Sequence, residues 1–424
     1  MTDTISHDAA TVPDPTPVAQ LDLPEIPFNI RELGRDESAR VYREISRESW
    51  IARSLIGYSV FEYDDVTSIL RDKRWHQAAS KLPQLMGITD PFFTERPPSI
   101  LSAEGELHTR LRRLVAKSFS PRSADRLRPF MRDVVNELVD AVADRGRADV
   151  ATDVCEPYPI PIICELLGAP RSDWQLFSRW AQDVLRIFNG TALAEIDVIK
   201  AAQIELNAYV AEMIEIRRDD PRDDLITHLI AAEEEGDRLS TEELIMMTNA
   251  VIVGGTDTTR NQLGCAIGVF LDHPEQWALL AERPELAPNA VEECMRFFGA
   301  IRGTARFASE DIVYRDVLFP AGTFVFPSLA SANLDQGVAE GDVDTFDITR
   351  EPVKGRVQMT FGSGIHYCLG ASLARAELQE ALPILARRMP DLAVEGEVVW
   401  KPQTTAIFGP DSMPVTFTPG VPAT

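Results

Sequence analysis

One cysteine stands in a glycine-rich loop immediately before a clear helical pattern. Residues 361–370 read FGSGIHYCLG, which places Cys368 between Gly364 and Gly370. Glycines allow a tight loop and a close backbone approach to something flat or bulky. The unpaired N–H groups at the start of a helix favour a thiolate over a thiol, and a thiolate is a strong axial ligand for haem iron. A buried structural cysteine in a turn is the alternative, and the repeated glycines favour the ligand interpretation.

A second stretch, GGTDTT at residues 254–259, lies within a long helical pattern. Two glycines inside a helix cost about 1 kcal/mol each relative to alanine, so they indicate close approach of a flat ligand. Thr258 can bond back to the carbonyl of Gly254 and open the helix slightly for a small molecule and water. Asp257 beside it supplies a carboxylate that can exchange protons. A kinked helix that packs closely on a neighbour is the alternative for this motif.

Two further pairs have helical spacing but less specific sequences. His108 and Arg112 are four residues apart, so one helix face presents two groups that can hold carboxylates, or simply a basic surface. Glu293 and Arg296 are three residues apart and share a helix face. The same E-x-x-R spacing occurs elsewhere in the chain, so only its context distinguishes this pair.

The loop at 361–370, followed by Leu-Ala-Arg at 373–375, resembles the haem-binding loop of cytochromes P450 of the soluble bacterial type. The resemblance extends from about residue 25 to about residue 418. It implies that Cys368 is the thiolate ligand of haem b. It also implies that Phe361 packs beside this ligand and that Gly370 lets the next helix approach the porphyrin.

The same resemblance implies roles for the other motifs. Gly254 borders an oxygen-activating groove, where Asp257 and Thr258 form the acid–alcohol pair that delivers protons. The two haem propionates are implied to contact four polar groups, which are His108, Arg112, Arg306 and His366. A buried ion network that supports the fold and the haem loop, with no catalytic role, is implied for Glu293, Arg296 and Arg350.

The elements that must position these residues are mostly helices. Apolar residues at three- and four-residue spacing predict long helices at 123–143, 173–187, 193–217 and 240–271. Short strands are predicted near both ends of the folded region, at 56–61, 307–314, 317–319, 323–325, 393–399 and 414–417. The fold class is therefore mainly α with small peripheral β-sheets, and the resemblance implies the cytochrome P450 fold.

The chain is expected to form one large domain. Residues 1–23 are polar and proline-rich, and we interpret them as a disordered lead-in without core contribution. Residues 24–424 then form a single haem domain. The acidic segment 336–345 departs from the family pattern, so its loop is expected to differ locally.

Composition excludes several other functions and locations. With 42 Lys+Arg and 66 Asp+Glu, the net charge is −24, which argues against nucleic-acid partners and polybasic membrane docking. The N-terminus lacks the basic start and apolar core of a signal peptide. The sequence also contains no apolar run of about 18 residues, so we expect no membrane anchor. Five scattered cysteines predict neither a disulfide framework nor a zinc cluster and fit the cytoplasm. We expect a monomer.

The function that the resemblance implies is a haem-thiolate monooxygenase that inserts one oxygen atom of O2 into an apolar small molecule, such as a terpenoid, steroid or fatty-acid-like compound. Two alternatives are a peroxide-driven hydroxylase of the same family and a haem-based sensor or binding protein without turnover. The acid–alcohol pair argues against both, since neither needs a proton relay. Candidate substrate-pocket residues are Leu85, Met86, Phe92, Phe93, Ile187, Val251, Ile301, Arg302, Leu329 and Phe408.

The acidic chain contains one basic stretch. Between His108 and Arg128 there are seven basic residues and one acid, Asp125, so this stretch carries +6 and the rest of the chain −30. In the family this helix borders the thiolate side of the haem. We therefore expect an acidic ferredoxin to dock near Arg110, Arg113 and Lys117 and to supply electrons through a reductase chain.

Overall fold

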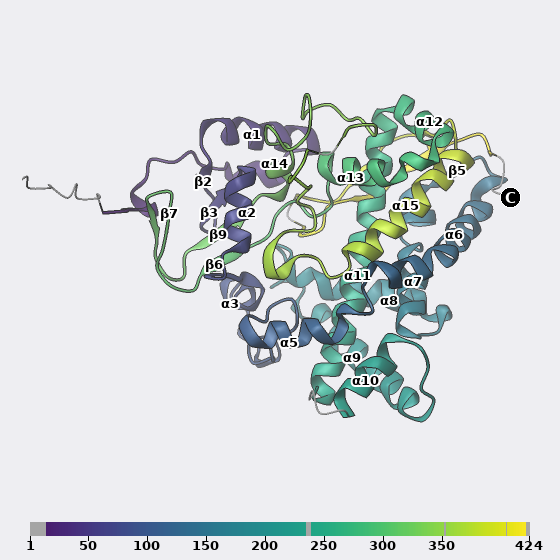
Figure 1. Ribbon diagram of the computed structural model, residues 1–424, viewed down its shortest axis with the longest axis horizontal. Coiled ribbons are helices and arrows are strands. Elements are labelled where there is room, and N and C mark those ends of the chain that lie inside the picture. The colour runs from purple at the N-terminus through teal and green to yellow at the C-terminus, as the bar shows by residue number, and fades with distance from the viewer. Residues whose placement is uncertain (1–13, 235–238, 352, 404, 421–424) are drawn as a thin grey trace, which may run out of the picture.

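The computed structural model describes residues 14–234, 239–351, 353–403 and 405–420. Helices dominate these ranges and small sheets lie at the periphery, which confirms the predicted fold class (Figure 1). The α-helices are α1 (Arg35–Glu48), α2 (Tyr63–Arg71), α3 (Leu82–Leu85), α4 (Pro91–Thr94), α5 (Gly105–Ala116), α6 (Pro121–Ala143), α7 (Pro159–Leu167), α8 (Trp174–Leu185), α9 (Ile196–Asp219), α10 (Leu225–Glu234), α11 (Thr241–Asp272), α12 (Pro274–Glu282), α13 (Ala287–Phe297), α14 (Leu329–Asn333) and α15 (Ala371–Arg388).

Helix α11 crosses the middle of the molecule (Figure 1). It begins with a capping box, in which the Ser240 hydroxyl accepts the Glu243 N–H at 3.1 Å and the Glu243 carboxylate accepts the Ser240 N–H at 2.9 Å. From there it continues for 32 residues, within one residue of the predicted bounds at each end. Helices α7, α8, α9, α12, α13 and α15 pack around it. Its length therefore depends on this packing, since an uninterrupted helix of this length is rarely stable on propensity alone.

Helix α15, which follows the cysteine loop, is the second organising element. It packs on α6, α11, α12 and α13, and most of its length is buried. The Tyr158 hydroxyl, itself fully buried, donates to the backbone carbonyl of Glu377 at 2.8 Å and ties α15 to the start of α7. The end of the cysteine loop is thus held by the main hydrophobic core.

The largest sheet has five strands in the order β2 (Ile51–Arg53), β3 (Tyr58–Val60), β9 (Phe324–Pro327), β6 (Arg306–Ala308) and β4 (Trp75–Gln77). Arg306 pairs with Val325 on one side and with Gln77 on the other, so the sheet places it next to the loop before α5. The predicted strand 307–314 is interrupted. A turn separates β6 from β7 (Ile312–Tyr314), where the Asp311 carboxylate accepts the N–H of Ala321.

Three smaller sheets complete the set in the described ranges. One has the order β1 (Thr16–Pro17), β8 (Val317–Phe319) and β7. A second has the order β10 (Ala393–Val394), β13 (Pro414–Thr416) and β5 (Arg147–Asp149). The last joins β11 (Val399–Trp400) to β12 (Pro410–Ser412). Every helix in the described part of the chain is too short or too polar to span a bilayer.

The predicted lead-in needs a correction at its C-terminal end. Residues 1–13 lie outside the described ranges. Thr16 and Pro17, however, pair in parallel with Val317 and Leu318, and the Val18 side chain is buried. These residues contribute to the core because an edge strand tolerates proline, which lacks the N–H that an inner strand needs.

A buried ion network ties α13 to the acidic segment 336–345. Arg296 binds both carboxylate oxygens of Glu293, at 2.7 and 2.8 Å, and Arg350 approaches the same carboxylate at 3.3 Å. The two arginines then donate to backbone carbonyls of this segment and its end, those of Glu340, Asp342, Val343 and Thr345. The three residues therefore meet as the sequence implied, and they fix an irregular loop through its backbone.

Replacing Glu293 by alanine should lower the free energy of unfolding by about 3–5 kcal/mol, because two guanidinium groups would lose their buried carboxylate. Urea unfolding followed by circular dichroism measures this change. The matched control is Glu285→Ala, which removes an exposed carboxylate paired with Arg283 and should cost under about 1 kcal/mol. Equal losses in the two variants would contradict a special role for the buried network.

Candidate active site

The cysteine loop folds back on itself before α15 begins. The Cys368 N–H donates to the Phe361 carbonyl at 3.0 Å, and the loop between them contains the single helical turn η8 (Gly364–His366). Gly364 has φ +72° and lies against the backbone carbonyl of Leu70, so a side chain at this position would collide with α2. The glycine in the motif thus permits both the left-handed conformation and the close approach.

The Cys368 thiol lies between positive groups. Burial raises the pKa of the thiol, while a backbone hydrogen bond at Gly370 and the charges of Arg112 and Arg375 act against this increase. The net direction is upward, so burial outweighs these groups in the protein without its cofactor. Deprotonation is instead expected to accompany binding of a metal cation, which releases the thiol proton.

Two residues of α11 leave an opening in an otherwise covered helix. Gly254 is exposed and nothing lies within 4 Å of the position that its Cβ would occupy, although Val253 and Thr256 are buried. One turn later, the Thr258 hydroxyl donates to the Gly254 carbonyl at 2.7 Å. The predicted back-bond is confirmed, and it ends at the carbonyl of the exposed Gly254.

Asp257 points to a different side of α11. Its side chain is only 9% exposed, and its Oδ1 lies 2.8 Å from Nε of Arg260, one turn further along the helix. The same oxygen has no hydrogen bond of good geometry. The structure therefore places the predicted acid next to Thr258 in the chain, with its carboxylate held by an arginine that sequence reasoning overlooked.

Two histidine rings meet at a tilted angle beside the loop. The rings of His108, on α5, and His366 lie 4.4 Å apart. His108 is buried, and its Nε2 has no hydrogen-bond partner. Burial, with the charges of His366 and Arg112, lowers the pKa of His108, so a bound anion is needed to stabilise its charged form.

His366 bonds to Glu104 at 3.0 Å. Burial acts to raise the pKa of Glu104, but the hydrogen bonds from His366 and from the Gln77 N–H outweigh it and lower the pKa. Sequence reasoning missed Glu104. Its position at the N-cap of α5 was a signal that could have identified it as a polar group near His108.

Arg306 is a buried cation without a carboxylate. It is 3% exposed and its Nη1 donates to the Thr304 hydroxyl and the Ala305 carbonyl, at 2.8 and 2.9 Å. No carboxylate within the described ranges forms an ion pair with it. Burial lowers the pKa of Arg306 to about 10, with Glu104 acting in the opposite direction. The site therefore has unmet demand for negative charge.

Known proteins are similar to this chain in both sequence and fold. The family described as Cytochrome P450 matches residues 168–283 and 276–389. The chain is 35% identical over 389 residues to mycinamicin IV hydroxylase/epoxidase of Micromonospora griseorubida, covering 89% of this chain and 92% of that one. It is 37% identical over 327 residues to vitamin D(3) 25-hydroxylase of Pseudonocardia autotrophica, covering 76% of this chain and 78% of that one. The chain belongs to the cytochrome P450 family.

The solved structure of the myxobacterial P450 CYP267B1 in complex with myristic acid superposes with a TM-score of 0.82 and 34% identity, over 90% of this chain and 97% of that one. The protein with the present sequence is therefore a P450 monooxygenase with haem b as its cofactor. The predicted family, fold class, enzyme class and cofactor are thereby confirmed.

The residues of the site fit haem b on three observations. Cys368 supplies a thiol at the start of α15, and a Cβ at Gly370 would meet only Cys368 Sγ, at 4.0 Å. The uncovered face of α11 at Gly254 leaves room for a flat group. The unpartnered Nε2 of His108 and the unpaired charge of Arg306 match the two carboxylates of the cofactor. Haem supplies oxygen activation when it is bound.

The cationic residues implied for the propionates occupy unequal positions. Glu104 bonds to His366 and attracts Arg306 electrostatically, and the His366 ring contacts the ring of His108 at a tilted angle. Arg112 instead donates to the Tyr367 carbonyl at 2.7 Å, next to Cys368. Arg112 thus also braces the cysteine loop.

The candidate substrate residues fall into several apolar clusters. Met86, Phe92, Phe93 and Ile187 meet in one small cluster with α9, and the rings of Phe92 and Phe93 lie 4.9 Å apart edge to face. The others are separate: Ile301 and Phe408 share a second cluster, Leu329 lies in the core under the largest sheet, Val251 lies in the main core, Leu85 is exposed, and Arg302 lies over the Phe408 ring.

Sequence reasoning also missed Arg375, in the Leu-Ala-Arg that ends the motif. Its guanidinium group donates to the Glu292 carboxylate at 2.5 and 3.0 Å and lies over the Phe361 ring, 4.5 Å from its centroid. Its Nη1 donates to the Tyr367 hydroxyl at 3.0 Å. The signal was available, since Glu292 directly precedes the Glu293 that was recognised.

Arg306→Met should have opposite effects on the haem-free and haem-loaded protein. Without haem it removes a buried, unpaired cation, so the free energy of unfolding should stay constant or rise. Haem binding should weaken by about tenfold or more, because a charge-assisted hydrogen bond of about 1.5–3 kcal/mol to a propionate is lost. Urea unfolding and haem titration of the apoprotein measure the two effects. A destabilised apoprotein with unchanged haem affinity would contradict this role; Arg74→Met, at an exposed ion pair, is the control.

Proposed function

We propose that this P450 inserts one oxygen atom of O2 into an apolar small organic molecule, with electrons from a ferredoxin and its reductase. Cys368 would bind the haem iron, and Asp257 and Thr258 would deliver protons. The haem domain expected at residues 24–424 would also include the paired strand Thr16–Pro17, and the protein would act as a monomer in the cytoplasm. The observation that carries this proposal is the hydrogen bond from Thr258 to the exposed Gly254 of α11, with a buried carboxylate on the preceding residue, Asp257.

Each residue has a defined task in this scheme. The bond from Thr258 to the Gly254 carbonyl takes that carbonyl out of the regular helical pattern, which widens the groove where O2 and water must fit. The Thr258 hydroxyl can then pass a proton into the groove. Asp257 restores that proton, because a carboxylic acid exchanges protons with water much faster than an alcohol does. His108, Arg112, Arg306 and His366 would hold the propionates.

Two other functions use the same cofactor. A peroxide-driven hydroxylase receives its oxygen already reduced, and a sensor performs no turnover, so neither requires a proton-delivering pair. The buried Asp257 and the bonded Thr258 favour the O2-dependent reaction over both. Consumption of reduced ferredoxin with formation of an oxygenated product would distinguish them.

An apolar substrate is favoured by the small cluster of Met86, Phe92, Phe93 and Ile187, which lies apart from the main core. One relative is named vitamin D(3) 25-hydroxylase, and one related P450 structure is a complex with myristic acid. Arg302 is the polar exception among the candidate residues. Its Nη1 donates to Gln403 at 3.3 Å, which orients it over Phe298 and Phe408.

The proposed function can be tested with the haem-loaded protein. Titration with myristic acid and vitamin D3 should shift the haem absorbance as bound substrate displaces water from ferric iron, and product should form with a ferredoxin system. Thr258→Ala should retain the absorbance spectrum and divert most reducing equivalents to hydrogen peroxide, whereas Thr258→Ser, which keeps the hydroxyl, should restore coupling. Unchanged coupling in Thr258→Ala would overturn the assignment of this residue.

Several basic residues of the expected ferredoxin surface form ion pairs within the protein. Arg110 forms an ion pair with Glu243, Arg126 lies 3.5 Å from Asp223, and Arg128 binds Glu380, so their charges are largely compensated. Lys117 and Arg122 are exposed and form no ion pair within the described ranges. We infer that an acidic partner would contact these two residues and Arg113.

Lys117→Glu, alone or with Arg113→Glu, should reduce ferredoxin-supported turnover at low salt several-fold, because charge complementarity accelerates encounter. Rising ionic strength should reduce wild-type turnover and narrow the difference in rate between wild type and variants. The reason is that 0.1 M salt largely screens exposed charges more than about 10 Å apart. Steady-state rates at several salt concentrations measure both effects. Arg147→Glu, at an exposed basic residue of β5, is the control and should have little effect. Equal turnover in Lys117→Glu and Arg147→Glu would argue against this docking surface.

A further inference from the structure

Arg96 is a cation without a carboxylate, and it lies beside Phe92, a member of the small apolar cluster described above. It comes two residues after α4, and its guanidinium carbon is 5.8 Å from the centroid of the Phe92 ring. No carboxylate within the described ranges forms an ion pair with it, and its one hydrogen bond there goes to Gln203 Oε1 on α9, at a long 3.4 Å. Most of the five N–H groups of this guanidinium are therefore available to a ligand.

The surroundings of Arg96 are those of a recessed group. The residue is exposed, and yet burial lowers the pKa of its guanidinium. The two observations agree when a side chain touches few atoms directly but is enclosed by protein at longer range, because desolvation depends on the wider surroundings. Enclosure strengthens the attraction to an anion, since water screens the two charges less than it does at the open surface.

The backbone and a set of amide side chains hold Arg96 in place. A Pro-Pro pair follows at 97–98, and a residue before proline is restricted to extended conformations. Gln203, which accepts the hydrogen bond, is buried and donates to Asn207 Oδ1 at 2.9 Å. Asn249 on α11 donates to the same oxygen at 2.6 Å. The guanidinium is thus oriented by neutral amides, which leave its charge uncompensated.

These amides connect Arg96 to the part of α11 that carries the exposed glycine. Asn249 precedes Gly254 by five residues, which is about 7.5 Å along the helix axis. A long hydrocarbon chain readily spans this distance. A molecule with its charged end at Arg96 can therefore place its apolar body against the cluster that contains Phe92 and still reach the site beside Gly254.

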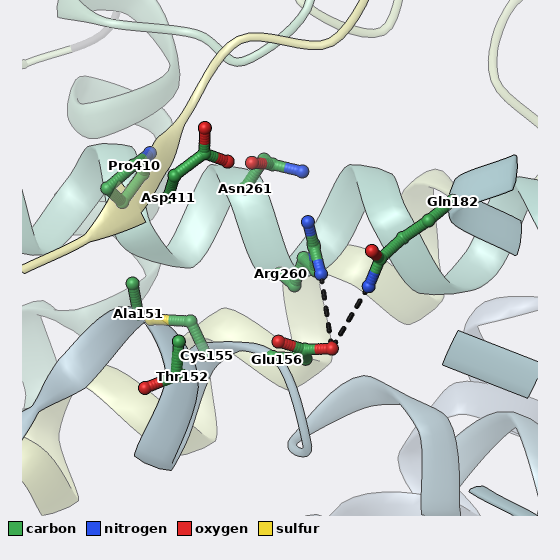
Figure 2. A pocket seen from close by; sticks show the side chains of 9 residues that line it. All are labelled: Ala151, Thr152, Cys155, Glu156, Gln182, Arg260, Asn261, Pro410 and Asp411. Carbon is green, nitrogen blue, oxygen red and sulfur yellow. Dashed lines mark hydrogen bonds and ion pairs between the residues drawn. The ribbon is translucent and has the colours of Figure 1, made fainter. Parts of the chain in front are cut away.

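Two other cations show the contrast, because each has a carboxylate of its own. Lys200 Nζ lies 5.3 Å from the centroid of the same Phe92 ring, but it binds Asp90 at 2.6 Å. Figure 2 shows Arg260 directed toward Glu156 at a polar pocket of about 190 Å³, and the two groups lie 3.5 Å apart. The charges of Lys200 and Arg260 are compensated, so neither place demands an anion.

The residues that fit the haem propionates lie elsewhere. They gather around Glu104, at the start of α5, and around the cysteine loop. Arg96 instead contacts Phe92 and α9. Its charge is therefore available to the substrate.

We propose that Arg96 is a specificity-determining residue that binds the carboxylate of an amphipathic monocarboxylic acid, whose apolar body packs on the cluster containing Phe92. This inference rests on the proposed function and narrows its substrate class from apolar molecules in general to long-chain acids. A carboxylate fits because the planar guanidinium binds its two oxygens through parallel N–H bonds. A phosphate dianion would need a second cation, and Lys200 is already bound to Asp90.

Calorimetric titration of the haem-loaded ferric protein tests this recognition without turnover. Wild type should bind myristic acid about tenfold or more tightly than methyl myristate, because the ester lacks the charge that the guanidinium recognises. Arg96→Gln should bind the acid about as weakly as wild type binds the ester, with little change for the ester itself. Arg96→Lys keeps the charge but loses the planar fork, so it should retain part of the preference.

Lys200→Gln is the matched control, because it removes one positive charge beside the same Phe92 ring. It changes the net charge of the protein by the same amount as Arg96→Gln, so a long-range effect of charge would be equal in the two variants. We expect its preference for acid over ester to stay close to that of wild type. Equal loss of this preference in the two variants would overturn the direct contact. If Arg96→Gln does not retain the haem absorbance spectrum, Arg96→Lys and the wild-type comparison decide.

The products of turnover give a second readout. A carboxylate bound at Arg96 fixes the depth of the chain, so wild type should oxygenate myristic acid at a narrow set of carbons. Arg96→Gln should broaden this set and raise KM more than it lowers kcat, because it removes binding that substrate and transition state share. Lys200→Gln should keep the wild-type product pattern. An unchanged pattern in Arg96→Gln would overturn the role of Arg96 in placing the substrate.

Binding and turnover separate this inference from the proposed function. If wild type prefers the acid to the ester but forms no oxygenated product with a ferredoxin system, the proposed function fails and recognition by Arg96 stands. If product forms from other apolar molecules while acid and ester bind equally, or while neither binds, the inference fails and the proposed function stands.

Discussion

The structure depends on one helix that is buried along most of its length and still leaves one face uncovered. Helix α11 carries core residues from Leu244 to Phe270, yet Gly254 is exposed and Thr258, one turn later, is only half-buried. An uncovered stretch in the interior is stable only where a ligand fills it, since lost packing contacts and exposed backbone cost free energy. The surrounding helices, the cysteine loop and the cationic residues can all be understood as the walls of that space.

Electrostatics around the space has two separate parts. On one side, His108 and Arg306 are buried polar groups that lack anionic partners of their own. Such groups are costly until an anion arrives, so the apoprotein is prepared for a dianionic cofactor. On another side of α11, Asp257 and Glu156 share Arg260, and negative charge is already compensated. The two arrangements differ, since the first would be neutralised by the cofactor and the second is neutralised by the protein's own side chains.

The buried network at Glu293 shows how a weak sequence motif acquires meaning. Exposed pairs with i,i+3 spacing, such as Arg128–Asp125, contribute little because water competes for both charges. Glu293 and Arg296 are each 5% exposed, and Arg350 joins them from more than fifty residues away. Their remaining hydrogen bonds go to backbone carbonyls of an irregular loop, which has few internal partners. Burial and connectivity, which spacing cannot report, give this pair its structural importance.

The sequence by itself determined the local features: the cysteine loop, the long central helix with its capping box, the Thr258 back-bond and the helical pairs. The capping box, the Thr258 back-bond and the helical pairs depend on neighbours within four residues, where spacing and residue type are sufficient. The cysteine loop is a contiguous motif of ten residues, and the full length of the central helix also needs the packing around it. Tertiary structure alone decided that Val18 belongs to the core, that Glu104 holds His366, and that Arg260 stands between Asp257 and Glu156. These relations join residues far apart in the chain or depend on burial, and both are set only when the elements pack together.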